Sequence, residues 1–376
     1  MSDPVPYFDL RAQARSLGPA LHKAACDVID SGNYVLGQPV EAFEEAFAAY
    51  CGVRHAVALN SGTSALHLGL LAAGVQPGDE VITVSMTFVA TAAAVLYAGA
   101  IPRFVDIDPA RGCMDPAKLE AAITPRTRAI IPVHLHGRSA DMTAILAIAR
   151  QHGIVVIEDA AQAHGATHDG KPIGSFGEMA CFSFYPAKNL GACGEGGAIV
   201  TDDDVLARRL RILRDWGQQE KYVHTVLGFN FRMDAIQGAL LGVKLPHLPA
   251  WTEARRKLAR RYDENLRQIG MQGPQPGPAG EHVYHVYAIR VPDRDRVRKE
   301  LADAGVSTSI HYPIPVHLQP AYEGLGYHRG DFPETEQFAA ETLSLPIYPE
   351  LSTSQVDRVC DVLSHVVRGV NVVGGN

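Results

Sequence analysis

The stretch Cys181–Gly197 carries one lysine, Lys188, in an otherwise apolar and glycine-rich setting. An amine attacks a carbonyl carbon only when part of it is unprotonated, and desolvation by Phe182, Phe184 and Leu190 would favour the neutral form. The glycines that follow would let the backbone turn tightly and approach a ligand. Lys188 is therefore the candidate nucleophile, although a surface lysine before a loop would show the same local sequence.

A second segment, Leu59–Leu66, places Gly62, Thr63 and Ser64 between an expected strand and an expected helix. Free backbone amides and the helix dipole favour an anion at such a point, typically a phosphate. An ordinary helix cap formed by Ser61 or Thr63 explains the same residues equally well. The segment is a candidate phosphate site only in combination with the lysine.

A third segment, Ile154–Gln162, is an apolar run that ends in the carboxylates of Glu158 and Asp159. Open α/β folds bind ligands at the carboxyl ends of their parallel strands. Asp159 would face a cofactor there, or it would cap the turn that follows.

Two other motifs give weaker signals for a phosphate-binding or metal-binding site. Gly165–Lys171 has the spacing of a phosphate-binding Walker loop, but Pro172 stands where a Ser or Thr should bind magnesium, and Asp169-Gly170 is typical of a hairpin turn. His134 and His136 alternate at a strand end without an evident third metal ligand, so hydrogen-bonded histidines are favoured over a zinc site. We expect no metal.

Composition excludes several classes of function. The chain has 376 residues, 47% of them hydrophobic and 20% charged, and a net charge of −7, which shows no footprint for nucleic acid. The apolar run from Phe88 to Ile101 is shorter than the roughly 20 residues of a membrane span. The N-terminus lacks a basic and then apolar leader, and six scattered cysteines without a Cys-x-x-Cys pair indicate reduced thiols. We expect a cytoplasmic protein.

Strands and helices alternate over the first 250 residues, which indicates an α/β fold with a mostly parallel sheet covered by helices. Residues 1 to about 50 read as an extended arm and then an amphipathic helix, Val40–Tyr50. The expected strands are 56–59, 80–84, 103–106, 129–134, 154–158, 180–184 and 198–201. The expected helices between them are 64–73, 88–98, 116–123 and 142–152.

The pattern changes near residue 250. A charged helix, 251–269, leads into the proline- and glycine-rich stretch 271–280, a linker or long loop. An expected strand, 283–291, and expected helices, 293–304 and 354–367, follow. The chain thus divides into a large α/β domain, 1–250, and a smaller α+β domain, 251–376.

Four motifs in this order resemble the DegT/DnrJ/EryC1/StrS family of sugar aminotransferases, which use pyridoxal 5'-phosphate (PLP) on the aspartate-aminotransferase fold, fold type I. The matching segments are Gly62–Leu66, Glu158–Gln162, Ser183–Lys188 and Gly228–Asp234. The similarity continues from Pro6–Leu10 through Gly37–Phe43 to Ile310–His317, so it covers nearly the whole chain.

The resemblance implies a role for each matching residue. Lys188 would bind the cofactor covalently and move the proton between substrate and cofactor, and Asp159 would keep the pyridine nitrogen protonated. The remaining cofactor contacts would be Gln162 at the ring 3-oxygen, Gly62, Thr63, Ser64 and Ser183 at the phosphate, and Phe88 over the ring, where a core aromatic is an equal alternative.

The resemblance also implies a homodimer with shared active sites. Asn230 would reach the phosphate from the partner subunit, and Arg232 would support that interface or bind a substrate carboxylate. Tyr312 and His317, together with Tyr185, would contact the sugar nucleotide, although a proline-braced loop with packing aromatics explains the first two as well.

The implied reaction moves an amino group from an amino acid, L-glutamate, to a nucleotide-linked keto-sugar. The segments Trp216–Tyr222 and His311–His317 are most similar to enzymes that aminate C3 of a dTDP-3-keto-6-deoxyhexose. The alternatives are C4 of a 4-keto-sugar nucleotide, as in perosamine synthases, and a keto-cyclitol. A sugar dehydratase, which typically has histidine at the lysine position, and a non-enzymatic binding module are both disfavoured by Lys188.

Overall fold

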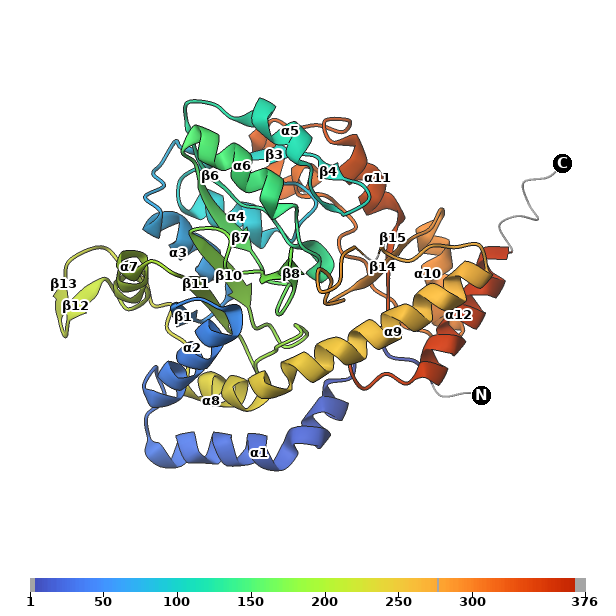
Figure 1. Cartoon of the computed structure of the whole chain (residues 1–376), viewed down its shortest axis with the longest axis horizontal. Coiled ribbons are helices and arrows are strands. Elements are labelled where there is room, and N and C mark those ends of the chain that lie inside the picture. Colours follow the sequence, from blue (N-terminus) through green and yellow to red (C-terminus); the bar gives the residue numbers. More distant parts are fainter. Residues whose placement is uncertain (1–3, 276, 369–376) are drawn as a thin grey trace.

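A seven-stranded sheet forms the centre of the molecule (Figure 1). The computed structural model describes residues 4–275 and 277–368. Across the sheet the strands follow the order β1-β11-β10-β7-β6-β2-β3; all neighbours are parallel except β11, which is antiparallel to both of its partners. Their bounds are His55–Leu59 (β1), Glu80–Val84 (β2), Ile101–Val105 (β3), Thr127–Ile130 (β6), Val155–Asp159 (β7), Met179–Ser183 (β10) and Gly197–Thr201 (β11). The expected mostly parallel α/β sheet is confirmed.

Helices cover both faces of this sheet because successive strand residues point to opposite sides. On β11, for example, Ile199 packs in one hydrophobic cluster, while Ala198 and Val200 pack in the other. The first cluster is covered by α3 (Gly62–Ala72), α4 (Ala90–Tyr97) and α7 (Asp204–Arg214). The second is covered by α2 (Gln38–Cys51), α6 (Met142–His152) and α8 (Ala235–Lys244).

The N-terminal segment differs from the expectation of an extended arm. Residues Leu10–Ser31 form a helix, α1, which Asp9 caps by accepting hydrogen bonds from the amides of Arg11 and Ala12. Only Leu21 and Val28 of this helix are buried. The helix contains Gly18-Pro19, a pair that is typical of turns, which is why the sequence did not indicate a helix here.

A second hydrophobic core lies in the C-terminal part. It is built by α9 (Leu248–Gln268), α10 (Arg294–Asp303) and α12 (Thr353–Arg368) on the paired strands β14 (Tyr287–Arg290) and β15 (Thr342–Leu345), and Val5 joins it. Figure 1 shows α9 running from the sheet layer to this core. Residues between the two paired strands pack back onto the large layer: Val316 and Phe332 contact Phe104 and Ala92. The division of the chain into two domains near residue 250 stays a proposal.

Shorter elements complete the chain: α5 (Pro116–Leu119), α11 (Pro333–Glu341), and the two-stranded pairs β4–β5 (Ile107–Asp108, Cys113–Met114), β8–β9 (Thr167–His168, Lys171–Pro172) and β12–β13 (Gln218–Glu220, Val223–His224). The β12–β13 hairpin projects from the body at the left of Figure 1. In the described part of the chain, no helix combines the length and apolar character needed to cross a bilayer.

Candidate active site

Asp159 is the last residue of β7, at the carboxyl edge of the parallel strands. Its Oδ2 accepts a 2.7 Å hydrogen bond from the Thr91 hydroxyl, and its Oδ1 accepts one of 3.2 Å from the Ala161 amide. Burial raises the pKa of the Asp159 carboxyl, although these donors and the nearby Lys188 act in the opposite direction. The charged carboxylate would therefore be stabilised by a further cationic partner.

Thr91 was not singled out from the sequence. It lies on α4, 68 positions from Asp159 in the chain, and only the packing of α4 beside the sheet edge brings the two side chains together. The Ala161 contact shows that Asp159 also braces the turn after β7, as the capping alternative expected.

Lys188 lies just after β10, in a turn where its amide donates to the carbonyl of Tyr185 at 2.8 Å. Desolvation lowers the pKa of its amine from 10.5 to about 8, and the negative charge of Asp159 opposes this shift. Phe184 and Leu190, on either side in sequence, are fully buried. Part of the amine is consequently neutral near physiological pH, as a nucleophile and proton carrier requires.

Four histidines line this region, a feature that the sequence analysis missed as a group. Burial lowers the pKa of His136 to about 4 and those of His164 and His311 to about 3, and it places that of His285 well below its usual range. The charge of Lys188 contributes to the last three shifts. The imidazoles of His164, His285 and His311 are therefore neutral and lie within electrostatic range of the amine, and only folding brings these distant positions together.

The first turn of α3 lies against the end of β10. Ser61 caps the helix, since its hydroxyl accepts a 3.0 Å hydrogen bond from the amide of Ser64. A Cβ on Gly62 would lie 2.7 Å from Cβ of Ser183, so only glycine permits this approach. Because the first amides of a helix lack intrahelical acceptors, Gly62 and Thr63 offer donors beside the Ser183 hydroxyl.

Gln162 connects two parts of the site. Its Oε1 accepts a 2.6 Å hydrogen bond from the His136 amide, and its Nε2 donates at 3.1 Å to the hydroxyl of Tyr312. The Tyr312 ring packs against Phe88 with 5.6 Å between centroids, while Phe88 itself is 53% exposed. An exposed aromatic at the mouth of the site favours a ligand-facing ring over the alternative of a core aromatic.

His317 and Tyr185 have contrasting environments. His317 is buried; its Nδ1 lies 2.6 Å from the Ser85 hydroxyl and its Nε2 lies 3.2 Å from Glu336, so neither ring nitrogen is free for a sugar. Tyr185 is 52% exposed beside Lys188 in sequence. Of the two, Tyr185 is available to a ligand in this structure.

Asn230 and Arg232 lie in the segment after the β12–β13 hairpin. Arg232 donates through Nε to the Asn230 side-chain oxygen at 3.0 Å and forms an ion pair of 3.1 Å with Asp215. The Asn230 carbonyl accepts a 3.5 Å hydrogen bond from Asn60, close to the α3 N-terminus, and the Asn230 side chain is exposed.

The remaining motifs have structural explanations. His134 is buried between Glu158, 3.1 Å from its Nε2, and the Ala140 amide, which donates to its Nδ1. Asp169-Gly170 forms the two-residue turn between β8 and β9, as predicted. Both motifs are thus accounted for by hydrogen bonding and turn geometry.

Comparison with known proteins assigns the chain to a protein family. The sequence model of the DegT/DnrJ/EryC1/StrS aminotransferase family matches residues 16–364. The chain belongs to this family.

Relatives of this aminotransferase match over almost their full length. A pleiotropic regulatory protein of Geobacillus stearothermophilus is 48% identical over 97% of this chain and 99% of its own. A dTDP-3-amino-3,4,6-trideoxy-alpha-D-glucose transaminase of Streptomyces venezuelae is 46% identical over 96% and 95%. The crystal structure of S. venezuelae DesV in complex with a ketimine intermediate superposes with a TM-score of 0.94, at 46% identity over 97% and 98% of the two chains.

The family is PLP-dependent, and the residues described here fit that cofactor. Gly62 leaves room where the α3 amides approach Ser183, which suits a phosphate. The buried Asp159 carboxyl, with its raised pKa, suits a cationic ring nitrogen, and the Lys188 amine is partly unprotonated. The fold class, the enzyme class and the cofactor expected from the sequence are therefore confirmed.

Proposed function

We propose that this nucleotide-sugar aminotransferase transfers the amino group of L-glutamate to C3 of a dTDP-linked 3-keto-6-deoxyhexose. The observation that carries the reaction is that the desolvated Lys188 amine, whose pKa is about 8, lies within electrostatic reach of the buried Asp159 carboxyl. The 46% identity to the S. venezuelae transaminase supports the choice of C3 and of dTDP.

PLP, when bound, supplies an electrophilic carbon and an electron-accepting ring. In our proposal Lys188 would hold the cofactor through its amine, and the same amine would accept and return a proton. Asp159, oriented by Thr91 and Ala161, would keep a proton on the ring nitrogen. Gln162 would approach the ring 3-oxygen.

The other cofactor residues bind and orient. Ser183 with the α3 residues Gly62, Thr63 and Ser64 would hold the phosphate, supported by the close contact at Gly62. Phe88, braced by Tyr312, would cover the ring and exclude water.

Substrate contacts would come from Tyr185, which is exposed, and from Tyr312, which is half-buried and bound to Gln162. Arg232 would meet a substrate carboxylate or brace a subunit interface. Since both nitrogens of His317 are engaged within the chain, we propose that His317 supports the sugar site by fixing the loop to Ser85 and Glu336.

We also propose a homodimer in which Asn230 completes the partner's phosphate site. The exposed Asn230 side chain and the large apolar side chains exposed nearby support this, because such surface commonly marks a protein interface. All six cysteines are free, which fits a reducing compartment, and we propose the cytoplasm.

The test is to incubate the holoenzyme with L-glutamate and a panel of 3-keto and 4-keto sugars linked to dTDP, UDP or GDP, together with a keto-cyclitol. We expect one product, a dTDP sugar aminated at C3, identified by mass and NMR. Amination at C4, of the cyclitol, or only of another nucleotide's sugar would replace the proposed acceptor. No product and no reaction with glutamate alone would refute transamination by these substrates.

A further inference from the structure

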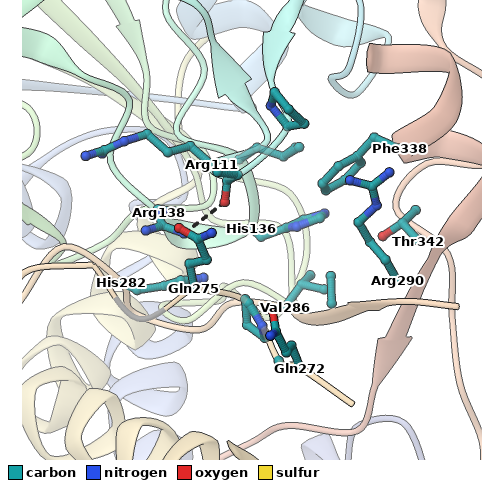
Figure 2. Close-up of a pocket in the computed structure, with 16 residues that line it drawn as sticks. Arg111, His136, Arg138, Gln272, Gln275, His282, Val286, Arg290, Phe338 and Thr342 are labelled. Carbon is teal, nitrogen blue, oxygen red and sulfur yellow. Dashed lines mark hydrogen bonds between the residues drawn. The ribbon is translucent and has the colours of Figure 1, made fainter. Parts of the chain in front are cut away.

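A cavity of about 410 Å³ lies outside the residues assigned to the cofactor and the sugar. Its wall is formed by 109–111, by 135–138, by the loop 272–275 and by side chains of β14 and α11 (Figure 2). We call it the arginine pocket, after Arg111, Arg138 and Arg290. Figure 2 shows Arg138 beside Gln275, and Arg290 beside Phe338 on another side of the cavity.

Arg138 is the unusual member of this wall. Only 5% of the residue is exposed, yet among the described residues its Nε has no hydrogen-bond partner. Nη1 lies 3.4 Å from the Ala110 carbonyl, and within residues 4–275 and 277–368 no carboxylate comes within 4.0 Å of the guanidinium. Burial lowers the pKa of Arg138, because a desolvated charge without a close counterion is unfavourable.

The charges around the pocket do not cancel. Arg290 is paired with Glu341 at 2.7 Å, and Arg111 contacts Glu281 at 3.4 Å. Glu281 also acts on Arg138, but only at longer range, so one carboxylate faces two guanidinium groups. The two histidines of the wall add no charge: burial places the pKa of His282 well below its usual range and that of His136 at about 4.

The rest of the lining suits a small organic molecule. Leu135, Val286, Ala288 and Phe338 supply apolar surface. Ligand pockets in proteins span about 300–1,000 Å³, so this cavity lies near the small end of that range. A compact metabolite fits the volume better than a sugar nucleotide.

The arginine pocket and the active site share a wall. The His136 amide donates to Gln162 at 2.6 Å, and its Nε2 lies 2.9 Å from the His311 carbonyl, next to Tyr312. A ligand against His136 would therefore contact a residue that holds Gln162 in place.

We propose that the arginine pocket binds a small organic anion, whose carboxylate or phosphate group pairs with Arg138 and Arg111 while its carbon skeleton lies against Phe338 and Val286. Guanidinium groups bind both kinds of oxyanion through two parallel hydrogen bonds. The anion would supply the counterion that Arg138 lacks.

Calorimetric titration of the holoenzyme with inorganic phosphate and, separately, with malonate tests this, with KCl holding the ionic strength constant. We expect one saturable event per chain with at least one probe. Phosphate alone would indicate a phosphate ester as the natural ligand, and malonate alone a carboxylate. If neither probe binds saturably, the proposal is wrong.

Two variants show where on the protein the anion binds. Arg138→Gln should weaken binding by about tenfold or more, because a charge-assisted hydrogen bond is lost. Ala288→Leu should weaken it as well, by filling the cavity without removing a charge, and it decides the matter if Arg138→Gln does not fold. Arg128→Gln, at an exposed arginine paired with Asp79, should bind like wild type. Equal binding in Ala288→Leu and wild type would place the anion elsewhere and overturn the proposal.

Discussion

The residues at the carboxyl edge of the sheet differ from those of the hairpin segment, residues 216–230, in how the chain holds them. Asp159 and Gln162 are buried, and each is fixed by hydrogen bonds within the chain. The hairpin segment instead exposes five large apolar side chains, Trp216, Tyr222, Val223, Val226 and Leu227, and then the Asn230 side chain. In our proposal the first region holds the reacting groups within one chain, whereas the second, with its exposed apolar surface, meets the partner chain.

Lys188→Ala should have the largest effect on the buried region. Removing the amine removes both the attachment of PLP and the proton carrier, so turnover should fall by about 10⁴-fold or more, as when a nucleophile and its base are lost together. The variant should also fail to trap PLP on borohydride reduction. Lys299→Ala, at an exposed lysine paired with Asp303, is the control and should behave as wild type. Near-normal turnover of Lys188→Ala would contradict the assignment of the nucleophile.

Asp159→Asn should have the second-largest effect on turnover. The amide keeps the shape of the side chain but offers one accepting oxygen in place of two, and it cannot stabilise a protonated ring nitrogen. The kcat should therefore fall by at least about 10²-fold while PLP stays bound. Asp141→Asn, which retains the cap of α6, provides the control. An unchanged kcat would mean that Asp159 serves only the turn formed with Ala161.

The pH dependence of PLP capture by the apoenzyme measures the environment of the amine without turnover. Burial depresses the Lys188 pKa to about 8, so the reactive neutral form should be half populated near pH 8 and decline below it. Asp159 raises this pKa, and Asp159→Asn should therefore move the midpoint to lower pH. A midpoint near 10.5, the ordinary lysine value, would show that the amine is not desolvated.

His317→Phe should have the smallest effect on catalysis. The ring would still pack against Phe332, but the hydrogen bonds to Ser85 and Glu336 would be lost. We expect the free energy of unfolding to fall by about 1–3 kcal/mol, with little change in KM for the sugar nucleotide. A raised KM with unchanged stability would instead support the direct sugar contact that the resemblance implied.

Strongly patterned elements could be predicted from the sequence. The bounds of β2 and α6 match the predicted ranges, and β10 differs by one residue at each end, because their apolar periodicity is set by the sheet. The expected strand 283–291 is shorter, Tyr287–Arg290, since Tyr284 adopts a left-handed φ of 48° that ends the extended backbone.

A candidate site residue could be predicted from the sequence where it lies within a single sequence motif. Asp159 ends the buried strand β7, and Lys188 lies shortly after the buried strand β10, so their place at the sheet edge follows from these strands. The contributions of Thr91 and His285 come from tertiary packing between distant segments, for which a single sequence carries no pattern. Within the stretch 271–280, which was expected as a linker or long loop, residues 272–275 line the arginine pocket.

Complementation between two inactive variants tests most directly whether the two regions meet across subunits. Asn230→Ala must first be shown to be impaired on its own, in rate or in affinity for PLP. Unfolding and refolding it together with Lys188→Ala would then give heterodimers in which one site carries both changes and the other carries neither. The account predicts recovery of activity to about one quarter of wild type for random pairing of two chains. No recovery despite confirmed heterodimers would mean that Asn230 serves its own chain, and the shared site would be contradicted.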